Sequence, residues 1–100
     1  EAAFEVPTRV SFDNAGSDIH TIIEVDTRDR PGLLHDLTRT LAANNVTIVS
    51  AVVATYGEQA VDTFYVKDMF GLKFQAADRQ GLLARRLREA VEQGAARARD

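Results

Sequence analysis

The chain has 100 residues, of which 45% are hydrophobic, and a formal net charge of −3 at neutral pH. This length suits one compact domain, and the slightly acidic balance gives no general attraction to nucleic acid or to anionic lipid. The chain has no cysteine, which excludes disulfides and thiolate metal sites, and no apolar run approaches the roughly 20 residues that cross a bilayer, so we expect a cytoplasmic protein without a membrane or nucleic-acid partner.

The first predicted element is a β-strand. Residues 1–8 lack clear periodicity and do not begin with methionine, so we expect them to be a linker from a preceding domain. Arg9–Asp13 alternates polar and apolar residues, which predicts a strand with Val10 and Phe12 on its buried face. After a turn-rich stretch, Thr21–Thr27 alternates in the same way and predicts a second strand.

The residues after the second strand predict the start of a helix. Pro31 has a preset φ and no N–H, both of which suit the first turn, and Asp29 can act as a capping acceptor. The predicted apolar stripe consists of Leu34, Leu37 and Leu41, supported by Leu33. Asn44–Asn45 tolerates the left-handed geometry that ends helices.

A hairpin and a second helix follow. Val46–Tyr56 and Ala60–Lys67 are rich in β-branched and aromatic residues, and Gly57 with Glu58 supplies the turn that joins them antiparallel. Beyond an irregular stretch at residues 68–74, the expected second helix is capped by Asp78 and is apolar at Leu83, Leu87 and either Ala90 or Val91. We expect Gly94 to end it and residues 95–100 to be a disordered tail.

The predicted order is strand, strand, helix, strand, strand, helix. Alternating strands beside amphipathic helices indicate an α+β fold in which a four-stranded antiparallel sheet carries two helices on one face. This is a ferredoxin-like pattern.

Thr21–Lys67, with its strand, Asp-Arg-Pro-Gly-Leu-Leu turn, helix and hairpin, resembles the ACT domain, a small-molecule regulatory module of metabolic enzymes. We therefore expect an ACT domain at residues 9–94. Three further segments are similar to the C-terminal ACT domains of bifunctional uridylyltransferase and uridylyl-removing enzymes: Arg9–Asn14, Thr55–Glu58, and Asp62–Asp68 with Phe70–Gly71.

The resemblance implies a function for the chain. It implies a glutamine-sensing domain without catalytic residues or a cofactor, which controls uridylylation and deuridylylation of the PII nitrogen-regulatory protein by a parent enzyme that uses magnesium and UTP. The implied partners are an amino acid, the other domains of the parent, and a second ACT domain in a homodimer or in the same chain.

The order of elements departs from the βαββαβ order of ordinary ACT domains. In that fold the last strand lies antiparallel beside the first, and here no strand follows the second helix. We therefore predict that Arg9–Asp13 takes the place of the last strand and pairs with residues around Ile22–Glu24.

The candidate ligand site is the turn before the first helix. Unpaired N–H groups at a helix N-terminus bind an α-carboxylate, and Gly32 lets a ligand come close. Asp29 can accept hydrogen bonds from an α-ammonium group, and Asn45 or Thr47 can reach a side-chain amide. The predicted ligand-binding residues are Thr27, Asp29, Arg30, Pro31, Gly32, Leu33, Asn45, Val46 and Thr47. In amino-acid-binding relatives the position of Thr27 is often histidine, and those of Asp29 and Thr47 are often asparagine.

Other interpretations remain open. A Pro-Gly pair often only starts a helix, so the domain could serve as a structural dimerisation or interdomain pairing module with no metabolite site. RNA recognition by sheet aromatics is disfavoured, because Phe64 and Tyr65 are adjacent and face opposite sides. His35–Asp36 is more simply a solvated helix face than a metal site, since neighbours on a helix point about 100° apart.

Two surfaces are candidates for protein contacts. The basic residues Arg85, Arg86 and Arg88 on the second helix form either a solvated face or a docking surface for the catalytic domains. Ile22, Val61 and Tyr65 can form an apolar patch on the sheet face that carries no helix.

Overall fold

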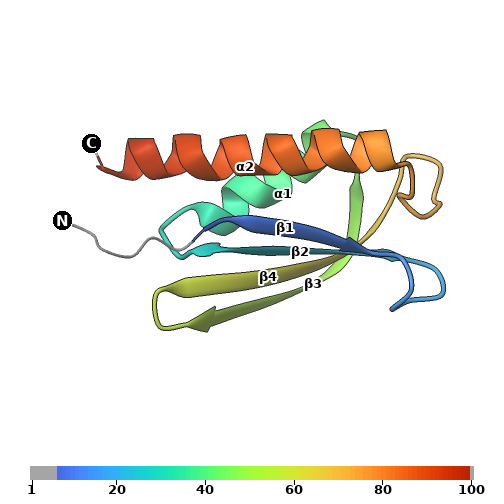
Figure 1. Ribbon diagram of the computed structural model, residues 1–100, viewed down its shortest axis with the longest axis horizontal. Coiled ribbons are helices and arrows are strands. Elements are labelled where there is room, and N and C mark those ends of the chain that lie inside the picture. The colour runs from blue at the N-terminus through green and yellow to red at the C-terminus, as the bar shows by residue number, and fades with distance from the viewer. Residues whose placement is uncertain (1–6, 100) are drawn as a thin grey trace.

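A computed structural model describes residues 7–99 of the chain. It consists of two layers, a four-stranded antiparallel sheet and two helices that lie on one of its faces (Figure 1). The elements are β1 (Arg9–Asp13), β2 (Thr21–Arg28), α1 (Leu33–Ala43), β3 (Thr47–Tyr56), β4 (Gln59–Lys67) and α2 (Ala77–Arg99). The prediction of an α+β, ferredoxin-like fold is confirmed.

The sheet has the strand order β1-β2-β4-β3. β1 runs antiparallel beside β2, with Val10 opposite Val25 and Phe12 opposite Ile23. The prediction that the N-terminal strand fills the edge beside the Thr21 strand is therefore confirmed. β3 and β4 form the predicted hairpin, and its turn contains Gly57 with a φ of 63°.

The core lies between the sheet and the helices. Alternate residues of the central strands β2 and β4 face the helices because successive side chains of a strand point to opposite faces. The buried cluster consists of Ile23, Val25, Leu33, Leu37, Leu41, Val46, Ala60, Phe64, Val66, Phe74, Leu83, Leu87 and Val91. The residues between them, including Ile22 and Tyr65, which pair with each other, are half-buried on the face without helices.

The start of α1 differs from the prediction. Gly32 is the N-cap residue and has a φ of 80°, so the right-handed helix begins at Leu33 and not at Pro31. No side chain caps this end, and the predicted role of Asp29 as cap is wrong. The apolar face consists of Leu33, Leu37 and Leu41, which were predicted, whereas Leu34 is 41% exposed and its predicted place in the stripe is wrong. The predicted end is confirmed, because Asn44 is the C-cap and Asn45 has a φ of 62°.

The prediction that α2 ends at Gly94 is wrong. The helix continues to Arg99, so residues 95–99 are helical and not part of a disordered tail, while residue 100 lies outside the described residues. A Cβ atom at Gly94 would overlap the Arg30 guanidinium and the Asp36 carboxylate. Gly94 thus allows α2 to approach α1 closely and does not terminate a helix. α2 starts at Ala77, which places Asp78 in the first turn and not at the cap.

Candidate functional site

The turn between β2 and α1 has the geometry of an anion-binding site. We call Gly32 and the N–H groups of Leu34 and His35 the candidate anion seat. Gly32 is exposed, and a Cβ atom built on it would meet only Arg30 Nη1, at 3.7 Å. The N–H of Leu33 donates to the carbonyl of Arg30 at 3.3 Å. Within residues 7–99 the structure records no acceptor for the N–H groups of Leu34 and His35. Such groups carry the positive end of the helix dipole and favour a negative ligand.

A buried carboxyl group lies on the strand next to β2. Asp62 of β4 is 2% exposed and points to the helix-covered face, as Phe64 does, and its Oδ1 has no hydrogen-bond partner in the described part of the chain. Burial raises the pKa of Asp62, and the negative charge of Asp29 raises it further. Asp29, in the turn, and Asp62 are therefore close enough to repel each other, and a cation between them would relieve that repulsion.

The sequence interpretation missed Asp62 as a candidate site residue. The signal was available, because the alternation of the segment Ala60–Lys67 places Asp62 on the same face as Ala60 and Phe64. An acidic residue at an inward position of a strand is uncommon unless it is paired or functional.

Replacing Asp62 with asparagine is expected to change how stability depends on pH. A raised pKa means that the folded protein holds the proton more tightly than the unfolded chain, whose carboxyl has the ordinary value of 3.8. As the pH rises above that value, the wild type should therefore lose stability relative to Asp62→Asn. Urea denaturation at pH 4 and at pH 7.5 measures this difference. If the difference in unfolding free energy between the two proteins were the same at both pH values, ionisation of Asp62 would not destabilise the folded protein.

Arg30 is engaged in contacts within the protein. Its Nη2 lies 2.8 Å from Asp36 Oδ2, and both side chains are nearly nine-tenths buried. Nη1 donates to the Pro31 carbonyl at 3.0 Å, and Nη2 lies 3.4 Å from the carbonyls of Ala90 and Val91. Arg30 therefore joins the turn to both helices, and its Nη1 lies beside Gly32 at the candidate anion seat.

The other predicted residues fall into two separated groups. Thr27 is 2% exposed, and its hydroxyl shares a 2.7 Å hydrogen bond with that of Thr8. Pro31 and Gly32 are exposed at the turn, whereas the side chain of Leu33 is in the core.

Asn45, Val46 and Thr47 follow the far end of α1. An eleven-residue helix is roughly 16 Å long. Asn45 and Thr47 are exposed there, and Val46 is buried. Within one chain, Asn45, Val46 and Thr47 therefore do not lie beside the turn between β2 and α1.

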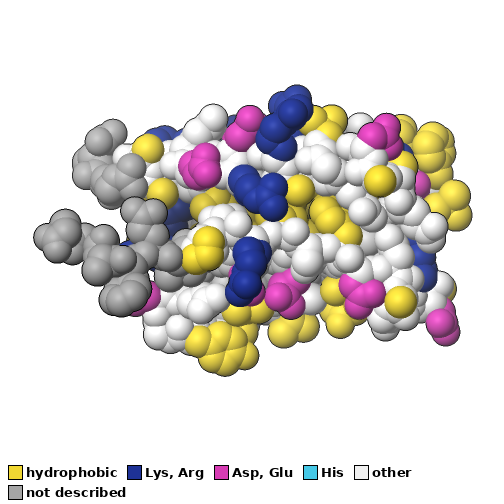
Figure 2. All heavy atoms as spheres, in the orientation of Figure 1, with side chains coloured by type: hydrophobic (Ala, Val, Ile, Leu, Met, Phe, Trp, Pro, Cys, Tyr) yellow, Lys and Arg dark blue, Asp and Glu magenta, His cyan; other side chains and the backbone are white. Residues whose placement is uncertain are grey.

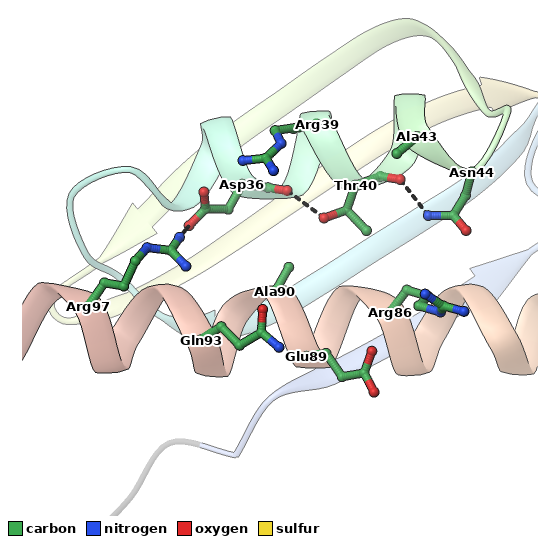
Figure 3. Close-up of a pocket in the computed structure, with 10 residues that line it drawn as sticks. All are labelled: Asp36, Arg39, Thr40, Ala43, Asn44, Arg86, Glu89, Ala90, Gln93 and Arg97. Carbon is green, nitrogen blue, oxygen red and sulfur yellow. Dashed lines mark hydrogen bonds and ion pairs between the residues drawn. The ribbon is translucent and has the colours of Figure 1, made fainter.

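A polar groove runs between α1 and α2 (Figure 3). Its volume is about 330 Å³, and it is lined by Asp36, Arg39, Thr40, Ala43, Asn44, Arg86, Glu89, Ala90, Gln93 and Arg97. The side chains of Asp36 and Arg97 point toward each other across it, 3.5 Å apart. None of the predicted ligand-binding residues lines this groove, and its lining contains both arginines and carboxylates, so it does not single out a ligand of one charge.

The part of the chain that the structure describes holds neither a metal-binding cluster nor a helix that could span a membrane. Residues 7–99 contain no cluster of three or more histidine or acidic side chains that could hold a metal ion. Asp36, from the His35–Asp36 pair, is bound to Arg30. None of the described helices has the length and apolarity that crossing a membrane requires.

Comparisons with known proteins agree on one family. A model described as the ACT domain matches residues 21–73. The chain is 68% identical over 99 residues to a bifunctional uridylyltransferase/uridylyl-removing enzyme of Cereibacter sphaeroides, covering 99% of this chain and 11% of the relative. An enzyme of the same name from Ruegeria pomeroyi is 66% identical over 98 residues, which are 98% of this chain and 11% of that protein. The chain thus spans about a tenth of the length of these curated relatives. No solved structure matches it.

Proposed function

Because the chain belongs to the ACT domain family, we propose that it is the glutamine-sensing regulatory domain of a bifunctional enzyme that uridylylates and deuridylylates the PII nitrogen-regulatory protein. The names of the relatives support the two activities of the parent. In this proposal the catalytic domains bind magnesium and UTP, and the ACT domain contributes only regulation. Bound glutamine favours the arrangement that removes uridylyl groups when nitrogen is plentiful.

The observation that carries the proposal is that unpaired N–H groups at the turn occur together with two carboxyl groups, one in the turn and one on β4, the strand next to β2. The N–H groups of Leu34 and His35 suit the α-carboxylate of an amino acid. The carboxyl groups of Asp29 and Asp62 suit its α-ammonium group. A zwitterion satisfies both environments at once, whereas a simple anion or a simple cation satisfies one.

A second ACT domain would complete the site. β3 is an outer strand of the sheet, and Val49, Val52 and Val53 along it are about half exposed. If two domains met along this edge with their α1 helices antiparallel, the turn of one would lie beside Asn45 and Thr47 of the other. Those side chains could then bind the glutamine side-chain amide. The partner domain is a second copy in a homodimer or another ACT domain of the same chain.

Regulation requires that glutamine bind two arrangements of the enzyme with different affinity. A coupling free energy of about 1 to 3 kcal/mol changes the response by about 5- to 150-fold. A sensor of a millimolar metabolite needs only about −4 kcal/mol of binding free energy, so a shallow site between two domains suffices.

The same exposed strand favours one alternative, a structural module that pairs domains without a metabolite site. In that case β3 would still be covered, but Asp29 and Asp62 would have no ligand.

Calorimetric titration of the domain with glutamine separates the two functions. We expect millimolar binding, which weakens at least about tenfold when the ammonium group is absent from the ligand, as in glutaramic acid, because a hydrogen bond to a charged group contributes about 1.5 to 3 kcal/mol. Asp29→Asn and Asp62→Asn should weaken glutamine binding by a similar factor.

Asp18→Asn is the matched control, because this exposed aspartate lies on the β1–β2 loop, away from the turn. It should bind glutamine as the wild type does. A folded, dimeric domain that binds no glutamine would support the pairing module. Equal binding of glutamine and glutaramic acid would contradict the ammonium site.

A further inference from the structure

The loop between β4 and α2 exposes a cluster of large apolar side chains. Met69 is 59% exposed, Phe70 74% and Leu72 64%, and we call these three residues the apolar knob. Single exposed apolar residues are normal, but three within four positions of a loop form a patch of the kind that marks a protein contact. Figure 2 shows hydrophobic side chains gathered at this end of the molecule.

The loop that carries the knob is held by its own hydrogen bonds. Asp68, which is 8% exposed, accepts hydrogen bonds at Oδ1 from the N–H of Phe70 at 2.8 Å and of Leu72 at 2.9 Å. Its own N–H donates to the Leu72 carbonyl at 2.7 Å, and Gly71 supplies the positive φ of 79° that closes the turn. The apolar side chains are thus displayed on an ordered turn, which lowers the entropic cost of binding.

The turn is also fastened to the body of the domain. Lys73 Nζ donates to the carbonyls of Asn14 and Ser17 at 2.7 and 2.6 Å, and the N–H of Phe74 donates to Thr21 Oγ1 at 2.7 Å. A movement imposed on the knob is therefore transmitted to the β1–β2 loop and to the start of β2. Both loops lie at the end of the molecule away from the two marked termini (Figure 1).

The size of the knob indicates what kind of partner it fits. A stable interface between free proteins buries at least roughly 1,000 Å², which three side chains cannot supply. A tethered partner needs far less, because the linker gives it a high effective concentration. The relatives of this chain are about nine times its length, since it spans 11% of each.

We propose that the apolar knob docks into an apolar pocket on another domain of the same polypeptide. This inference rests on the proposed function in one respect, because it takes the chain to be part of a longer enzyme. The contact would connect the ACT domain mechanically to the remainder of that enzyme.

Photo-crosslinking in the full-length enzyme tests the contact. The enzyme carrying Phe70→p-benzoylphenylalanine is prepared as a mixture of isotopically heavy and light subunits. Cross-linked peptides are identified by mass spectrometry. We expect cross-links from position 70 to a different domain. They should join light peptides only with light peptides and heavy peptides only with heavy peptides, because the contact lies within one polypeptide. Cross-links to the same loop of another copy, or no cross-links, would overturn the proposal.

A triple variant, Met69→Ser with Phe70→Ser and Leu72→Ser, tests the consequence. We expect glutamine binding to stay within about twofold of wild type, while most of the effect of glutamine on the two activities, about 5- to 150-fold, is lost. Leu82→Ser is the matched control, because Leu82 is a 41% exposed leucine on α2 outside the loop. Unchanged regulation in the triple variant would contradict the docking role. A wild-type enzyme that ignores glutamine would refute the proposed function and leave the cross-linking result unaffected.

Discussion

Replacing Arg30 with alanine is expected to lower the free energy of unfolding by about 3 to 5 kcal/mol, the cost of breaking a buried ion pair by removing one partner. The substitution leaves the Asp36 carboxylate, which is 12% exposed, without the guanidinium 2.8 Å away. It also removes the donor that lies 3.4 Å from the carbonyls of Ala90 and Val91 in α2. Urea denaturation of the purified domain measures the loss.

Arg97→Ala is the matched control for this prediction. Arg97 contacts the same Asp36 oxygen at 3.5 Å, but its side chain is 65% exposed. An exposed partner of this kind contributes under about 1 kcal/mol. Equal losses in the two variants would contradict the account, because they would mean that burial does not distinguish the two arginines.

Replacing Leu37 with alanine is expected to cost about 2 to 5 kcal/mol, because it removes a fully buried side chain and leaves a cavity beneath α1. Leu34→Ala makes the same chemical change on the same helix at a position that is 41% exposed, and should cost under about 1 kcal/mol. Thermal or urea unfolding of both variants measures the difference. A loss at Leu34 as large as that at Leu37 would show that the stripe predicted from the sequence, and not the observed one, faces the sheet.

The strands of the sheet could be predicted because the alternation that defines each one lies within a few consecutive residues. Alternation in Arg9–Asp13 and Thr21–Thr27 sets which side chains face the core, and the short turn-rich loop between these segments favours their pairing as an antiparallel hairpin. The apolar stripe of α1 was predicted correctly at Leu33, Leu37 and Leu41 and wrongly at Leu34. The start of the helix was predicted two residues too early, because Pro31 suits a first helical turn but Gly32 has a left-handed φ.

The contacts between the two helices could not be predicted in the same way. Gly94 was interpreted as a helix end, yet it is the position where α2 passes over Arg30 and Asp36, about 60 residues earlier in the chain. The contacts of Arg30 with α2 could not be predicted either, because Ala90 and Val91 lie about 60 residues away in the sequence. Arg30 was therefore interpreted only as a ligand-binding residue.

The candidate site was predicted in part. The open turn at Gly32 and the unpaired N–H groups after it follow from the Pro-Gly pair and the helix behind it. Asn45 and Thr47 follow the other end of α1, as the predicted helix end implies, so their role in ligand binding depends on the proposed second domain.

Amide chemical shifts recorded while glutamine is added to the ¹⁵N-labelled domain test the central claim most directly. If the start of α1 binds the carboxylate, the amides of Leu34 and His35 should shift most, and those of Asn45 and Thr47 should shift as well in a dimer. A folded dimer in which saturating glutamine leaves the Leu34 and His35 amides unmoved would contradict the sensing account.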